Sequence, residues 1–244
     1  MDLKIILGIP GPWRSPEELG QAISASGVGY HLNANHDRLI GPGSDAELTW
    51  QEPDATLRRA YEMANRQSLS HADLDLIEHH AGCAYLVCPG GSLDAGRDAM
   101  ALAAIVLRAG GFGVRVETAG VALSAWDWLA QSERSHTHVG ALYISFVSLF
   151  SRSGEVHSCG MHNLGLPDAM VTAQQNTANG GELLRGFLMS VVHEQLTLRS
   201  GYSTLSDGAG GIYQLTHRDC VLYEPNDPYF NPFGIWEIAP RSNA

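Results

Sequence analysis

Histidine and cysteine crowd together in residues 155–168, the densest set of possible metal ligands and nucleophiles in the chain. His157, Cys159 and His162 could bind a divalent metal, or Cys159 and a histidine could form a nucleophilic pair. In a continuous strand His157 and Cys159 share one face and His162 lies on the other, so one metal requires a bend at Gly160. No orienting acid stands at a recognisable spacing, and we favour structural roles for these residues.

A second group of ligand-type residues recurs at helical spacing. His71, Asp75 and His79 stand four residues apart, so a helix capped by Ser70 would place them on one face. The spacing could hold a metal, but it is not the His-Glu-x-x-His arrangement of metalloproteases. We favour a solvated helix face.

The turn Pro89–Ser92 lies between an expected strand and an expected helix, where backbone amides can hold an anion. It has neither the lysine nor the spacing of a phosphate-binding loop. We therefore predict a tight turn with a helix cap, and we expect no cofactor.

Strand and helix patterns alternate along the chain, with Ser153 and Gly154 as one of the turns. We expect strands at 3–9, 30–34, 38–40, 47–51, 83–88, 113–117, 142–150, 155–162, 213–216 and 221–223, and helices at 15–26, 54–66, 70–80, 93–109, from 124, and 182–195. This order predicts an α+β fold in which helices pack on a largely antiparallel sheet, with loosely repeated strand-helix-strand units. No linker interrupts 1–244, so we predict one compact domain, with a division into 1–80 and 81–244 as the alternative.

The charge balance restricts the partners. Lysine and arginine total 15 against 26 aspartate and glutamate, a net charge of −11. Such a surface repels phosphate backbones and favours a basic protein, so we expect no direct nucleic-acid binding. No apolar run is long enough to span a membrane and no signal segment is recognisable, which predicts a cytoplasmic protein that does not bind membranes.

The C-terminal residues 223–236 carry many aromatic side chains between three prolines. Rigid aromatics beside acids suit a protein interface, and they could seal a homodimer, although a tail packed against the core would have the same composition. As candidate partner-binding residues we select Asp73, Asp75 and Glu78 on the expected helix, and Asp227, Tyr229 and Phe230 in the tail.

From Cys83 to Pro240 the order of features resembles a bacterial family known as domain of unknown function 4261. The resemblance rests on Leu107–Gly111, on Val121–Ser124 before a tryptophan, and on the signature Gly160–Asp168. Proteins of this sort also resemble immunity proteins encoded beside type VI secretion toxins.

That resemblance implies a non-enzymatic immunity protein that binds and blocks a cognate toxin, which we expect to be a nuclease with a basic groove. The alternative is a metal-dependent or thiol-dependent hydrolase that uses the group His157, Cys159 and His162.

Overall fold

A computed structural model describes residues 3–26, 29–65, 67–152, 155–171, 177–194, 196–201, 203–206 and 211–241. The helices are α1 (Pro16–Ala25), α2 (Leu57–Ala64), α3 (His71–Glu78), α4 (Leu93–Arg108), α5 (Ala125–Ser135), α6 (Gly140–Phe146) and α7 (Thr177–Glu194), with a 3-10 helix at Met161–Leu164. The strands are β1 (Lys4–Gly11), β2 (His31–Leu32), β3 (Arg38–Ile40), β4 (Asp45–Gln51), β5 (Gly82–Pro89), β6 (Gly113–Val116), β7 (Val121–Ser124), β8 (Ser148–Arg152), β9 (Glu155–Cys159), β10 (Asp168–Val171), β11 (Thr204–Ser206), β12 (Ile212–Arg218) and β13 (Ile235–Pro240).

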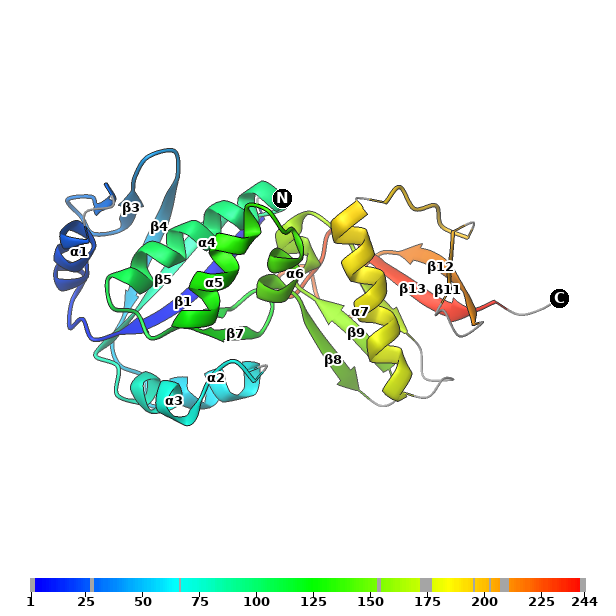
Figure 1. Cartoon of the computed structure of the whole chain (residues 1–244), viewed down its shortest axis with the longest axis horizontal. Helices are drawn as coiled ribbons and strands as arrows, with labels where there is room; N and C mark the ends of the chain where they lie inside the picture. The colour runs from blue at the N-terminus through cyan, green and yellow to red at the C-terminus, as the bar shows by residue number, and fades with distance from the viewer. Residues whose placement is uncertain are drawn as a thin grey trace.

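The strands form two sheets (Figure 1). The seven-stranded sheet has the order β2-β3-β4-β5-β1-β6-β7, and the six-stranded sheet has the order β11-β12-β13-β10-β9-β8. The ladders are antiparallel except for β10 and β13, which pair in parallel. The prediction of an α+β fold with largely antiparallel sheet is confirmed. Strands from both sides of residue 80 share the seven-stranded sheet, so residues 1–80 form no sheet of their own.

Alternation along β5 separates the two faces of the seven-stranded sheet. Cys83 belongs to a small hydrophobic cluster with residues of α2 and α3, whereas Ala84 belongs to the main core with residues of α1, α4 and α5. Successive side chains of a strand point to opposite faces. The α2–α3 hairpin therefore covers one face, α1, α4 and α5 cover the opposite face, and α7 packs on the six-stranded sheet (Figure 1). The main core also includes Val156 and Ile238 of the six-stranded sheet, so one hydrophobic cluster joins both sheets.

Serine caps stand at the starts of four helices, as predicted for Ser70 and for the turn Pro89–Ser92. The hydroxyls of Ser15, Ser70, Ser92 and Ser124 each accept the backbone N–H three residues later, at the starts of α1, α3, α4 and α5. Each bond satisfies an amide that has no partner inside the helix. At Gly91, which has φ +88°, the predicted turn donates its N–H to Asn163 O, so the helix cap and the turn both serve structural roles.

The strand predicted at 142–150 is wrong in its first half. Residues 140–146 form α6, and β8 starts only at Ser148. Most of α6 is buried, and an apolar run this short carries no periodicity that separates a buried helix from a buried strand. The turn Ser153–Gly154 lies outside the described residues, as do Arg66 and Gln195 at the ends of two predicted helices.

Two further strand predictions are wrong. Strand β9 ends at Cys159, because Gly160 has φ +108° and starts the 3-10 helix that contains His162. Residues 221–223 form no strand, whereas β13 begins at Ile235, at the end of the aromatic segment 223–236. Pairing with β10 and β12, both remote in sequence, decides where β13 lies.

Within the described ranges, no helix is both long and apolar enough to cross a membrane.

Candidate functional site

The α2–α3 hairpin presents a charged outer face because its inner face is fixed on the sheet. Tyr61, Leu74 and Ile77 are buried in the cluster that also contains Cys83. The Tyr61 hydroxyl donates to Gly8 O of β1 at 2.7 Å, and this bond is buried. The hairpin is thus anchored by apolar contacts and by hydrogen bonds, which include the one from Tyr61 and one from the Ser124 N–H of β7 to Ser68 Oγ at 2.9 Å. The acids of α3 lie on its outer side.

Three carboxylates on this outer face converge on one guanidinium. Arg58 Nη1 donates to Asp75 Oδ1 and to Glu78 Oε2, each at 2.6 Å, and Arg58 Nε donates to Glu62 Oε1 at 3.0 Å. The hydrogen bond from Arg58 lowers the pKa of Asp75, and the same three acids raise the pKa of Arg58. With three negative charges against one positive charge, the cluster keeps a net negative charge.

The three acids selected on α3 differ in their contacts and in their exposure. The side chain of Asp73 accepts the Ser70 N–H at 2.8 Å and the Ser70 hydroxyl at 2.7 Å, which completes a capping box. Asp75 and Glu78 are 63% and 48% exposed despite their contacts with Arg58. Asp73 therefore stabilises the start of α3, and Asp75 and Glu78 are the better placed for contact with a partner.

Two large apolar side chains are also exposed on the same hairpin. Met63 of α2 is 80% exposed, and Leu76 of α3 is 51% exposed. Exposed apolar residues that lie together and are rimmed by polar residues mark protein-binding surfaces. We call the set Met63, Leu76, Asp75 and Glu78 the hairpin face.

The selected tail residues are fixed to the six-stranded sheet. Tyr229 packs on Phe150 and Tyr223, with ring centroids 6.2 and 5.4 Å apart. Asp227 Oδ1 accepts the Tyr229 N–H at 2.8 Å, and Asp227 O accepts the Phe230 N–H. Tyr229 and Phe230 are half-buried. The tail is therefore packed against its own chain, and the structure does not bring it together with α3 (Figure 1).

The His157, Cys159 and His162 group does not converge. His157 Nε2 lies 3.2 Å from Tyr223 Oη, Cys159 Sγ lies 4.0 Å from Thr118 O, and the buried His162 sits beyond the bend at Gly160. In the part of the chain that the structure describes, no three His, Cys, Asp or Glu residues are placed to hold a metal. Burial raises the pKa of the Cys159 thiol and lowers that of His162 to about 4, which disfavours a thiolate and an imidazolium.

A buried polar network at Asp168 was missed by the sequence analysis. Ser158 Oγ donates to Asp168 Oδ1, and Asn231 Nδ2 donates to Asp168 Oδ2, both at 2.6 Å. Asn231 also donates to Leu166 O at 3.0 Å. This network ties the C-terminal segment to β9 and β10. Asp168 closes the Gly160–Asp168 signature, but nothing local points to Asn231, which is 63 residues away.

Comparison with protein-family models, curated proteins and solved structures finds no match for this chain. The resemblance to the family known as domain of unknown function 4261 therefore stays a prediction.

Proposed function

We propose that this chain is a non-enzymatic immunity protein that binds and neutralises a cognate secreted toxin. The observation that carries the proposal is the hairpin face, where the exposed acids Asp75 and Glu78 and the exposed Met63 and Leu76 belong to one helical hairpin. An interface of this composition suits a basic protein, because opposite charges speed encounter and apolar side chains supply area to bury.

The family resemblance supplies the class of partner. A nuclease of the type VI secretion system carries a basic groove for phosphate, and an acidic protein with a net charge of −11 can approach that groove with favourable steering. We place the neutralisation in the cytoplasm, where such a toxin meets its substrate. Homodimerisation through the aromatic tail stays a prediction.

The first experiment is a pull-down from the native host, followed by co-expression with the partner that mass spectrometry identifies. We expect a basic protein to be retained at a fixed stoichiometry and its toxicity to be relieved. If no partner is retained and no toxicity is relieved, the proposal is wrong.

A second experiment tests the hairpin face itself. The double variant Asp75→Asn, Glu78→Gln should slow association with the toxin about 10-fold at low salt and should weaken its salt dependence. The double variant Asp94→Asn, Glu133→Gln is the matched control, because it also removes two exposed acids, 90% and 75% exposed, from α4 and α5 on the other face of the sheet. Equal effects of both variants would indicate a general charge effect and would exclude the hairpin face as the interface.

A further inference from the structure

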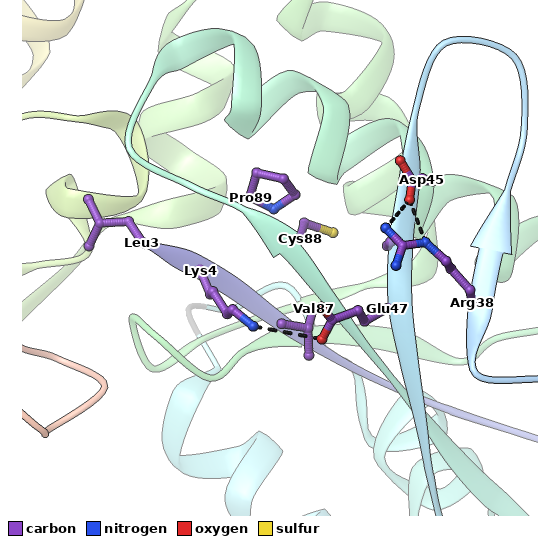
Figure 2. A pocket seen from close by; sticks show the side chains of 9 residues that line it. Leu3, Lys4, Arg38, Asp45, Glu47, Val87, Cys88 and Pro89 are labelled. Atoms are coloured by element: carbon purple, nitrogen blue, oxygen red, sulfur yellow. Dashed lines mark hydrogen bonds and ion pairs between the residues drawn. The ribbon is translucent and has the colours of Figure 1, made fainter. Parts of the chain in front are cut away.

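A pocket of about 160 Å³ lies at one edge of the seven-stranded sheet, and no residue of α2 or α3 lines it (Figure 2). The ends of the adjacent strands β3, β4, β5 and β1 line it. Arg38 lies opposite Glu47, Glu47 lies opposite Val87, and Lys4 lies opposite Pro89. Residues paired across antiparallel strands project from the same face. The strand register therefore gathers both cations and a carboxylate over the apolar floor of Val87 and Pro89.

The charges in this pocket are balanced but incompletely paired. Lys4 Nζ lies 3.7 Å from Glu47 Oε2, which is longer than a hydrogen bond. Arg38 contacts Asp45 through both Nε, at 2.6 Å, and Nη2, and both contacts go to Oδ2. Among the described residues, Asp45 Oδ1 has no hydrogen-bond donor. Lys4 and the two carboxylates thus keep capacity for further hydrogen bonds.

This charge arrangement selects a class of ligand. A lone anion in the pocket would meet Asp45 and Glu47, and a lone cation would meet Lys4 and Arg38. A ligand that carries both charges can place each beside its opposite. The volume is also below the roughly 300 Å³ at which drug-sized sites begin, so the ligand must be small.

We propose that this pocket binds a small zwitterionic α-amino acid. Its carboxylate lies beside Lys4 and Arg38, and its ammonium group lies beside Glu47 and Asp45. The four charged side chains are about half exposed, so water and salt screen the contacts. We therefore expect weak binding, with a Kd on the order of 1 mM.

The sequence provides a specific reporter, because Lys4 is its only lysine. Protein grown with 13C-labelled lysine should give a single Cε signal in NMR spectra. Titration with alanine should shift this signal to saturation, whereas acetate and methylammonium at matched ionic strength should not. Absence of a saturable shift with alanine, or an equal saturable shift with acetate or methylammonium alone, would overturn the proposal.

Single substitutions test whether alanine binds in this pocket. Glu47→Gln should weaken alanine binding about 10-fold, because it removes a partner of the ammonium group, and circular dichroism should show an unchanged fold. Glu133→Gln is the control and should bind like the unaltered protein. Equal alanine affinity of Glu47→Gln and the unaltered protein would also overturn the proposal. These measurements are independent of toxin binding, so either proposal can fail without the other.

Discussion

Asp75 and Asp168 are both hydrogen-bonded aspartates, but Asp75 is exposed and Asp168 is buried. Asp75 stands on the exposed hairpin face, where the hydrogen bond from Arg58 lowers its pKa. Asp168 is buried, and burial raises its pKa to about 6, although Ser158 and Asn231 both donate to it. The comparison shows that a hydrogen bond from a cation favours the charged form at the surface, whereas bonds from the neutral Ser158 and Asn231 do not offset the loss of water in the interior.

The largest expected effect is the loss of the buried network. Asp168→Ala would leave Ser158 Oγ and Asn231 Nδ2 buried without their acceptor. We expect the free energy of unfolding to fall by about 3 kcal/mol. Urea unfolding measures this free energy. Asp168→Asn keeps the shape of the side chain, so we expect it to lower the free energy of unfolding by less than Asp168→Ala. If Asp168→Ala lowers the free energy of unfolding no more than the replacement of an exposed acid does, the structural role of this network is contradicted.

The second prediction concerns pH. The pKa of Asp168 is about 6 in the folded state against 3.8 ordinarily, so the folded state binds more protons than the unfolded state between these values. The contribution of Asp168 to stability is therefore fully present below about pH 4 and is lost as the pH rises through 6. We expect the difference in unfolding free energy between the unaltered protein and Asp168→Asn to fall by about 2 kcal/mol from pH 4 to 7. A pH-independent difference would show that the pKa of Asp168 is not raised.

The smallest expected effect lies on the hairpin face. Arg58→Gln removes the shared partner of three exposed acids, and water can solvate these acids in its place. We expect a small decrease in the urea midpoint that shrinks further with added salt. The more negative face should also associate faster with a basic partner. A loss of stability comparable to that of Asp168→Ala would show that the two regions do not differ as described.

The sequence by itself determined what depends on near neighbours. Ser15, Ser70, Ser92 and Ser124 identify helix starts because a cap involves only residues three positions apart. Cys83 and Cys88 are five residues apart, an odd spacing that puts them on opposite faces of a strand, and in β5 they lie in different hydrophobic clusters. The class of fold followed from the order of such elements.

Only the tertiary structure decided the rest. The apolar run at 142–147 fits a buried helix or a buried strand, and packing selects the helix. Arg58 meets Asp75 and Glu78 because two helices fold into a hairpin, and Asn231 meets Asp168 because the strands β10 and β13 pair in parallel. Such contacts depend on which distant segments pack together, so local patterns of residue type and spacing cannot specify them.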